Sequence, residues 1–476
     1  MKLFLAFVLY FQIVTAAQVF EKNEKNSDVV DAAEFDSEKS VTELSYGDNT
    51  IKIPTTLIPS SKEDQLRTFI AKNQTSEVSK LIREGVNLNV LYSDGEYPLV
   101  LSTKEGKSDI AKLLLDNGAI ANVRDGWFLT PLHWAAKKGN EEMVRRLIAN
   151  GADVNGLDYL NRTALHAASH EGQAKTAKIL IDHGALLDEV DTFGYTALHL
   201  AALKGKFEAA KVLIDGGADE NAIVYFNRSP LHLAAKSGEA KIVKLLIDKG
   251  VQVDARDGLD FTALHTASHY GKLEAVKALI EGGADINAKV LHKKTSVHIA
   301  TREGHRDVVK FLVEKGAQVD ARDVFEHTPL HVALAAENGT IETAKILVEY
   351  GADVNAEVWL AAKWTPLHLA TIEGKEDIVK MLIEHGADVN ARDLLNRTPH
   401  DIAFIKDQKE IAQILRENGA EVRTNMEWDA SESLKLESLR NKMNTLKAII
   451  EHSERGENVK PNDVDLISYD FDDVAE

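Results

Sequence analysis

The 476-residue sequence contains no cysteine, which excludes disulfide scaffolds, zinc ribbons, iron–sulfur sites and cysteine nucleophiles. Positive charge is also scarce. The 56 Lys and Arg face 75 Asp and Glu, a formal net charge of −19, which opposes binding to nucleic acid and to anionic membrane surfaces. Beyond residue 17 no segment approaches 18 consecutive apolar residues, so we expect no membrane span in the mature chain.

The N-terminus has the composition of a targeting segment. Lys2 precedes an apolar run over residues 3–14, and the small residues Thr15, Ala16 and Ala17 follow. This order is typical of a secretory signal peptide cleaved after Ala16 or Ala17. We therefore predict that residues 1–17 are a signal peptide and that the mature protein is secreted or lies in the lumen of the secretory pathway.

A short motif, Thr-Pro-Leu-His or a close variant, recurs eight times along the chain. Successive copies start 33 residues apart, and only the last interval is longer, at 37 residues. A Thr or Ser hydroxyl can cap a helix N-terminus, and Pro fits the first helical position, which needs no N–H. Each copy therefore predicts the start of a helix. The copies begin at Thr130, Thr163, Thr196, Ser229, Thr262, Thr295, Thr328 and Thr365.

Glycines and apolar residues complete the repeating unit. Gly139 and its equivalents are placed to end the first helix, and Met143, Val144 and Leu147 give the next segment one apolar face. Gly151 and its equivalents are placed to end this second helix in the left-handed conformation. A unit of 33 residues cannot bury its apolar face alone, so neighbouring units must stack.

The motif resembles the ankyrin repeat, a 33-residue unit with the pattern T-P-L-H-x-A. Degenerate copies at about Asp64, at Tyr97 and at Thr398 extend the array to about eleven units over residues 64–423. The resemblance implies an all-α solenoid of helix-turn-helix-loop units that recognises a protein partner through loop tips and a concave helical face. The family supplies no chemistry of its own. In the last unit, we expect His400-Asp401 to present polar side chains outward.

The motif histidines are predicted to be structural. Packed helices lie about 8–10 Å apart, so histidines one unit apart cannot share a metal ion that needs nitrogens at about 2.0–2.1 Å. No H-E-x-x-H or G-x-S-x-G motif occurs either, so we predict no catalytic residue, no metal and no cofactor. The motif histidines are His133, His166, His199, His232, His265, His298, His331 and His368.

The loops between units carry the candidate partner-binding residues. Their tips begin with Asp125, Asp158 and Asp191 and then alternate between Val, as in Val224, and Asp, as in Asp257. Apolar residues follow one or two positions later, and if they face water they form a stripe suited to a partner. The alternative is that each packs on the adjacent loop. The candidates, with one residue from a first helix, are Trp127, Trp134, Tyr159, Phe193, Tyr225, Phe226, Leu291, His292, Phe325, Trp359, Leu360 and Trp364.

Among these tips, 225–226, 291–292 and 359–364 are expected to contribute most to binding. They lack the Asp, and the last lies beside part of a four-residue insertion, two residues near 335–338 and two near 359–364. Insertions in repeat proteins often mark the binding face.

Five N-x-Ser/Thr sequences occur, and three of them precede a motif Thr or Ser by two positions. Asn tolerates the left-handed conformation better than most residues, so it can stand in for Gly in these turns. Entry into the secretory pathway would also make them N-glycosylation sites. The five residues are Asn73, Asn161, Asn227, Asn338 and Asn396.

The flanks differ from the array. Residues 18–63 are acidic and without sustained periodicity, which predicts a disordered lead. Within residues 424–455, apolar residues spaced three and four apart predict an amphipathic helix that docks on the last unit or mediates self-association. Residues 456–476 form an acidic tail with interleaved apolar residues, either solvated or a docking motif. The helical apolar residues are Leu436, Leu439, Met443, Leu446 and Ile450.

The sequence thus predicts a non-catalytic, secreted or lumenal protein-binding repeat protein. One alternative is a secreted effector or toxin, because the latrotoxin family also carries long ankyrin arrays; this chain has no room for that family's large preceding helical region. A second alternative is an intracellular scaffold whose N-terminus is not a signal peptide.

Overall fold

The computed structural model describes residues 44–46, 49–51, 61–335, 341–358 and 363–422. The chain divides into two units, Met1–Ser61 and Lys62–Glu476. The predicted signal peptide, the helix within 424–455 and the acidic tail lie outside the described residues. No helix in the described part of the chain is long and apolar enough to cross a membrane.

The first unit contains a short antiparallel hairpin. Its strands are β1 (Leu44–Tyr46) and β2 (Asn49–Ile51), with Leu44 opposite Ile51 and Tyr46 opposite Asn49. Between the two strands the sequence reads Gly47-Asp48, a dipeptide typical of hairpin turns. The expectation of a lead without structure over 18–63 is therefore wrong for these two strands.

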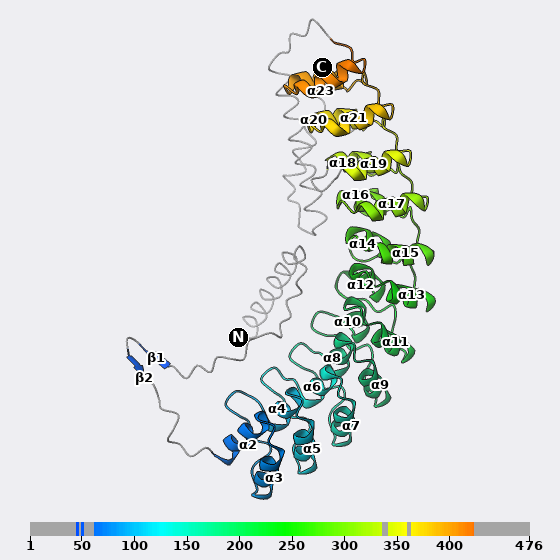
Figure 1. Ribbon diagram of the computed structural model, residues 1–476. Helices are drawn as coiled ribbons and strands as arrows, with labels where there is room; N and C mark the ends of the chain where they lie inside the picture. Colours follow the sequence, from blue (N-terminus) through cyan, green and yellow to red (C-terminus); the bar gives the residue numbers. More distant parts are fainter. Residues whose placement is uncertain (1–43, 47–48, 52–60, 336–340, 359–362, 423–476) are drawn as a thin grey trace, which may run out of the picture. The chain divides into compact units, whose positions relative to one another are not determined.

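The second unit is built from eleven pairs of helices stacked in one row (Figure 1). The first helices of the pairs are α2 (Lys62–Ala71), α4 (Pro98–Lys104), α6 (Pro131–Lys138), α8 (Ala164–Glu171), α10 (Ala197–Leu203), α12 (Pro230–Ser237), α14 (Ala263–His269), α16 (Ser296–Arg302), α18 (Pro329–Ala335), α20 (Pro366–Ile372) and α22 (Pro399–Ile405). The second helices are α3 (Thr75–Arg83), α5 (Ser108–Asp116), α7 (Glu141–Ala149), α9 (Ala174–Asp182), α11 (Phe207–Asp215), α13 (Ala240–Asp248), α15 (Leu273–Glu281), α17 (Arg306–Glu314), α19 (Ile341–Glu349), α21 (Glu376–Glu384) and α23 (Lys409–Glu417). The predicted all-α solenoid is confirmed for this unit.

The third unit of the array shows how the motif forms a helix pair. Thr130 is the N-cap of α6, with Pro131 at the first helical position, and Gly139 ends the helix at φ 70°. The Asn140 side chain then caps α7 by accepting the Met143 N–H at 3.0 Å. These contacts satisfy backbone groups that a helix end leaves without intrahelical partners.

Stacking produces one continuous apolar core. First helices pack against the first helices of neighbouring units, and second helices pack against second helices. The core runs as a single cluster from Leu66 in α2 to Leu415 in α23. Because each unit buries its apolar face only against its neighbours, the stability of the array is close to a sum over interfaces.

The motif histidines connect neighbouring units. In α6 the Thr130 N–H donates to His133 Nδ1 at 3.2 Å, and His133 Nε2 donates to the carbonyl of Arg162 in the next loop at 2.9 Å. The ring is therefore neutral, with its proton on Nε2. His166, His232, His298 and His368 make the same link to the residue 29 positions later, at 3.0–3.3 Å.

The link changes where the next loop begins with Val instead of Asp. His265 precedes Val290 and donates to Ala288 O at 3.0 Å. His199 and His331 precede Val224 and Val358, and their Nε2 atoms form no hydrogen bond of ordinary geometry within the described residues. The alternation of Val and Asp at the loop starts is thus accompanied by an alternation in the hydrogen bonds between units.

The last unit keeps the cap with a different side chain. Asp401 replaces the histidine, and its Oδ2 accepts the Thr398 N–H at 2.8 Å. Both His400 and Asp401 are buried. The expectation that they face outward is wrong, because the cap requires the residue in the histidine position to turn back toward Thr398.

We predict that stability falls as pH drops from 6.5 to 4. Burial lowers the pKa of His199, His265 and His298 to about 4 and that of His331 to about 3. The unfolded chain binds these protons near pH 6.5 while the folded chain does not, so each histidine contributes up to about 1.4 kcal/mol of destabilisation per pH unit. Urea unfolding at pH 7, 6 and 5 measures this slope. Equal stability at all three values would contradict neutral buried histidines.

Candidate protein-binding surface

The loops between units are hairpins that close with a backbone hydrogen bond, as from the Asp125 N–H to Leu129 O at 3.0 Å, and they are of two kinds. In one kind, a buried Asp also accepts two backbone N–H groups. Asp125 Oδ1 accepts from Trp127 and Leu129, both at 2.9 Å, and Asp158, Asp191, Asp257, Asp323 and Asp393 repeat this pattern at 2.8–2.9 Å. The Asp side chain thereby holds the turn from inside.

In the other kind, Val replaces Asp, and the loop keeps the backbone hydrogen bond but lacks the side-chain acceptor. The Val224 N–H donates to Arg228 O at 3.0 Å, and Val358 N–H to Trp364 O at 3.0 Å. Residues Tyr225–Asn227 form a short 3-10 turn, with Phe226 at φ 60°. Val224 is buried. The start of this loop is therefore held by packing even though the Asp side chain is absent.

Both closures leave tip side chains in water along part of the array. Trp127 is 63% exposed, and Tyr225 and Phe226 are 64% and 57% exposed. Tyr159 and Phe193 are also exposed. These hairpins project beside the first helices α6 to α12 (Figure 1). These five side chains are thus exposed, although the Trp127 and Tyr159 rings also contact each other across adjacent hairpins.

Hydrogen bonds between neighbouring tips explain why the side chains stay outside. The Tyr159 N–H donates to Trp127 O at 3.2 Å, and the Thr192 N–H donates to Leu160 O at 2.8 Å. The backbones thus fill the space between adjacent hairpins. The rings of Trp127 and Tyr159 lie 5.1 Å apart, centroid to centroid, so the exposed aromatic surface continues from one hairpin to the next.

A second row of exposed apolar residues, missed in the sequence, lies beside the first. Leu157, Val190 and Ile223 each precede the anchoring Asp or Val, and all three are exposed. Phe128 is exposed as well. From the loop before α14 onward this position holds charged residues, four cations and one acid, Glu357. Arg256 donates to Lys289 O at 2.9 Å and Arg322 to Glu357 O at 2.9 Å. The two rows together, here named the tip stripe, comprise Trp127, Phe128, Leu157, Tyr159, Val190, Phe193, Ile223, Tyr225 and Phe226.

Trp134 is half-buried on α6 and connects a hairpin to the helices. Its Nε1 donates to Asp125 Oδ2 at 3.1 Å. Lys104 and Lys137 place their ammonium groups 5.5 and 5.7 Å from the indole ring. The Trp134 ring therefore lies between the base of the Trp127 hairpin and the ammonium groups of two lysines on the first helices α4 and α6.

The remaining candidates do not extend the exposed stripe. Trp364 is only 1% exposed, so its assignment to a binding surface is wrong: it precedes the motif Thr365, pairs back with Val358 and belongs to the core. His292 and Phe325 are half-buried, with ring centroids 6.2 Å apart. Trp359, Leu360 and the Leu291 side chain lie outside what the structure describes.

The asparagines in the sequons adopt the turn conformation. Asn161, Asn227 and Asn396 have φ between 50° and 60° and are exposed, and Asn73 has φ 56°. They occupy the backbone conformation of Gly194, which has φ 78°. Asn338 lies outside the described residues. Glycosylation of these side chains stays a prediction.

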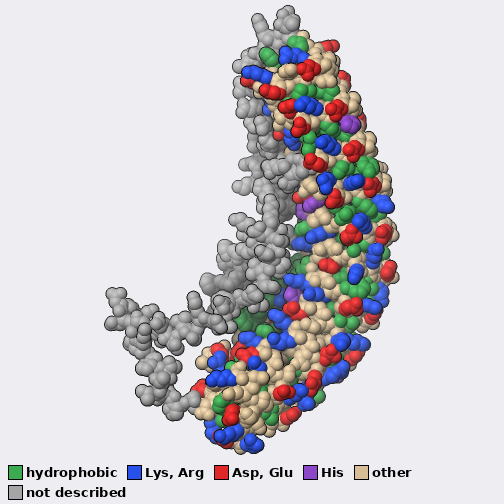
Figure 2. All heavy atoms as spheres, in the orientation of Figure 1, with side chains coloured by type: hydrophobic (Ala, Val, Ile, Leu, Met, Phe, Trp, Pro, Cys, Tyr) green, Lys and Arg blue, Asp and Glu red, His purple; other side chains and the backbone are tan. Residues whose placement is uncertain are grey.

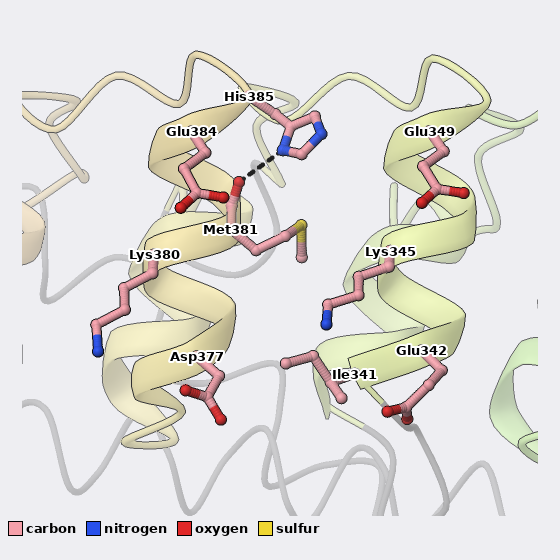
Figure 3. A pocket seen from close by; sticks show the side chains of 9 residues that line it. All are labelled: Ile341, Glu342, Lys345, Glu349, Asp377, Lys380, Met381, Glu384 and His385. Carbon is pink, nitrogen blue, oxygen red and sulfur yellow. Dashed lines mark hydrogen bonds between the residues drawn. The ribbon is translucent and has the colours of Figure 1, made fainter.

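A groove between second helices contains no cluster of side chains arranged for catalysis or metal binding. Ile341, Met381 and His385 lie with charged side chains of both signs between α19 and α21 (Figure 3). His385 Nδ1 donates to Met381 O at 2.8 Å, within its own helix end, and Lys380 pairs with Glu376 at 2.6 Å. In the described part of the chain, no three His, Asp or Glu side chains are placed to hold a metal ion. The tip stripe is therefore the better candidate site.

Comparison with known proteins agrees with this architecture. The family model for ankyrin repeats (3 copies) matches residues 68–158, 156–224, 220–290, 289–358 and 333–426. The chain belongs to the ankyrin repeat family. Ankyrin repeats generally act as protein-interaction modules, and the fold is typically non-catalytic.

Individual ankyrin relatives share only parts of this chain. It is 38% identical over 74 residues to the ankyrin repeat protein FPV222 of Fowlpox virus (strain NVSL), covering 16% of this chain and 10% of the viral protein. The human ASB11 ankyrin repeat domain is 28% identical, with a TM-score of 0.43, over 47% of this chain and 99% of that domain. The ankyrin repeat domain of Bcl-3 is 29% identical, with a TM-score of 0.41, over 46% and 98%.

We predict stability effects of very different size for two tryptophans of the ankyrin array. Trp364→Ser should lower the free energy of unfolding by at least about 3 kcal/mol, because it empties a large buried site. Trp127→Ser should change it by less than about 1 kcal/mol, because most of that ring is in water. Urea unfolding of the full chain compares them. Equal losses would show that the Trp127 tip is part of the core.

Proposed function

We propose that this protein is a non-catalytic binding protein that captures a protein partner on the tip stripe, and that it acts in the secretory-pathway lumen or outside the cell. The exposure of aromatic residues on consecutive hairpins, from Trp127 to Phe226, carries the proposal. Contiguous exposed apolar surface is uncommon on soluble proteins and marks interaction sites more often than chance.

The composition of the tip stripe suits a binding hot spot. Trp and Tyr are enriched among the residues that dominate interface energies, and Trp127, Tyr159 and Tyr225 supply them here. Neighbouring hairpins are joined by backbone hydrogen bonds such as Thr192 N–H to Leu160 O, 2.8 Å. Binding therefore needs little additional ordering of the hairpin backbones, which lowers its entropic cost.

The proposed location depends on the N-terminal sequence. A basic residue, an apolar run and small residues at 15–17 have the order of a secretory signal. An array without cysteine is compatible with that route, because its stability comes from stacked interfaces and needs no disulfides. The effector and scaffold alternatives differ from this proposal in partner and compartment, and both would use the same surface.

Polar substitution of the tip stripe should abolish partner capture. The variant carries Trp127→Ser, Tyr159→Ser, Tyr225→Ser and Phe226→Ser, and we expect at least a tenfold loss of co-purified partner with the same thermal midpoint, because hot-spot aromatics are removed without touching the core. Quantitative mass spectrometry of proteins captured by immobilised full chain measures it. The control, Tyr350→Ser, changes an exposed aromatic residue outside the hairpin tips. Equal capture by both variants would overturn the assignment.

Expression in a eukaryotic secreting cell tests the location. We expect protein in the medium that starts at Ala17 or Gln18 and that shifts in mass on N-glycan removal, because the signal would be cleaved and the exposed sequons modified. N-terminal sequencing and glycosidase treatment of medium and lysate measure both. An intact Met1 on unglycosylated cytosolic protein would support the intracellular scaffold instead.

A further inference from the structure

Lysines without acidic partners line the turns between first and second helices. Six of them, here named the lysine row, form no ion pair within the described residues: Lys107, Lys137, Lys138, Lys204, Lys206 and Lys272. The stem of Lys206 lies against Gly172 and that of Lys272 against Gly238, each in the preceding unit. The row thus runs across unit boundaries, with aliphatic stems packed on backbone and ammonium groups left for solvent.

Several cations on or next to the second helices form ion pairs instead. Lys112 pairs with Glu142 at 2.8 Å, Lys244 with Glu281 at 2.9 Å and Lys249 with Asp215 at 3.0 Å, each across two neighbouring units. Basic and acidic side chains are interspersed over the face seen in Figure 2. At these turns the six unpaired lysines outnumber three acids, Glu105, Glu171 and Glu239, so the turns carry a local net positive charge in a chain of net charge −19.

The lysine row adjoins the tip stripe. Trp134 bonds to Asp125 at the base of the Trp127 hairpin, and its ring also contacts the Lys137 ammonium at 5.7 Å. A ligand that suits both surfaces must combine acidic groups for the lysines with apolar side chains for the aromatic tips. An acidic peptide with interleaved apolar residues has that chemistry.

The chain carries such a segment at its own C-terminus. Residues 461–476 contain six acidic residues and no Lys or Arg. Apolar residues lie between the acids: Val464, Leu466, Ile467, Tyr469, Phe471 and Val474. The charge of this segment is opposite to that of the lysine row, and its aromatic residues match those of the tips.

The connecting chain is long enough. Residues 423–460 could span roughly 125 Å if fully extended. With a helix over 431–454, about 36 Å long, and the remaining residues extended, they would still span about 80 Å. Six steps of about 10 Å separate α22 from α10, so the segment can reach Lys204 and Lys206 of its own array.

We propose that residues 461–476 bind the lysine row and the adjoining end of the tip stripe in the same chain, and that protein partners compete for this surface with acidic, apolar segments of their own. This inference rests on the proposed function, because it names the chemistry of ligand that the same surface takes. The bound tail then limits capture to partners that bind this surface tightly enough to displace it.

A labelled peptide of residues 461–476 tests the proposal by fluorescence anisotropy. The receptor is the full chain with its tail neutralised by Asp463→Asn, Asp465→Asn, Asp470→Asn, Asp472→Asn and Asp473→Asn. We expect the peptide to bind this chain at least tenfold more tightly than the unaltered chain, whose own tail occupies the surface. Raising NaCl from 50 to 300 mM should weaken binding, because the contact is largely electrostatic.

Charge reversal identifies the surface. Lys137→Glu, Lys138→Glu, Lys204→Glu and Lys206→Glu together, in the neutralised chain, should reduce peptide affinity at least tenfold. The control reverses four exposed, unpaired cations on second helices, Arg145→Glu, Lys211→Glu, Lys241→Glu and Lys345→Glu, and should leave affinity within about twofold. A scrambled peptide of the same composition should bind at least fivefold more weakly, because its apolar residues no longer match the tips.

Three results would overturn the inference. These are no binding of the peptide to the neutralised chain, equal loss with the control lysines, and a concentration-dependent dimer of the unaltered chain that neutralisation abolishes, which would place the tail on a second copy. If the peptide fails to bind while the Ser variant of the tip stripe still loses its partner, only this inference fails and the proposed function stands.

Discussion

The hydrogen bond from a motif histidine to the next hairpin, formed by five of the eight histidines and shifted to Ala288 in a sixth, is the interaction on which the array depends. His133 holds the N-terminus of α6 through Nδ1 and the Arg162 carbonyl through Nε2, at 2.9 Å. One neutral ring thus connects the start of a helix to the loop of the following unit. Because the ring is buried, losing either bond leaves a polar atom without water, which costs more than the bond itself contributes. The contact therefore sets the register between neighbouring units.

A fixed register allows the hairpins to present apolar side chains without burying them. Asp125 and Val224 close their hairpins with the same backbone hydrogen bond, to which Asp125 adds its carboxylate, and both residues are buried while the tip side chains are exposed. The tips then pair through backbone hydrogen bonds, which fill the space that a ring would otherwise occupy. The exposed rings are thus held on a scaffold whose stability does not depend on them, and such a surface can change its specificity without changing its fold.

The sequence predicts the helices well because their signals are local. Thr130, Pro131 and Gly139 act within one turn of their own positions, so capping alone places α6. Tip exposure is different, because it depends on which backbone groups of two consecutive hairpins pair. Trp364 shows the limit most clearly: it lies near an insertion and resembles a tip residue in sequence, yet its position directly before Thr365 turns it into the core.

Other misses have similar physical causes. Leu157, Val190 and Ile223 precede the anchoring residue, a position that holds charged residues in later units, so the apolar row does not stand out as a pattern along the whole sequence. Asp401 was expected to be exposed because carboxylates usually are, but it takes over the cap of a histidine. The hairpin of β1 and β2 carries a Gly-Asp turn signal that the acidic composition around it conceals.

Site-specific photo-crosslinking tests the central claim, that the partner contacts the hairpin tips, most directly. A photoreactive phenylalanine analogue replaces Tyr159 or Tyr225 on the tip stripe, or Tyr350 at the end of α19, which is exposed on the second-helix side. The account predicts covalent adducts with the partner from positions 159 and 225 and none from 350. Adducts from position 350 alone would contradict it and would move the binding surface to the second helices.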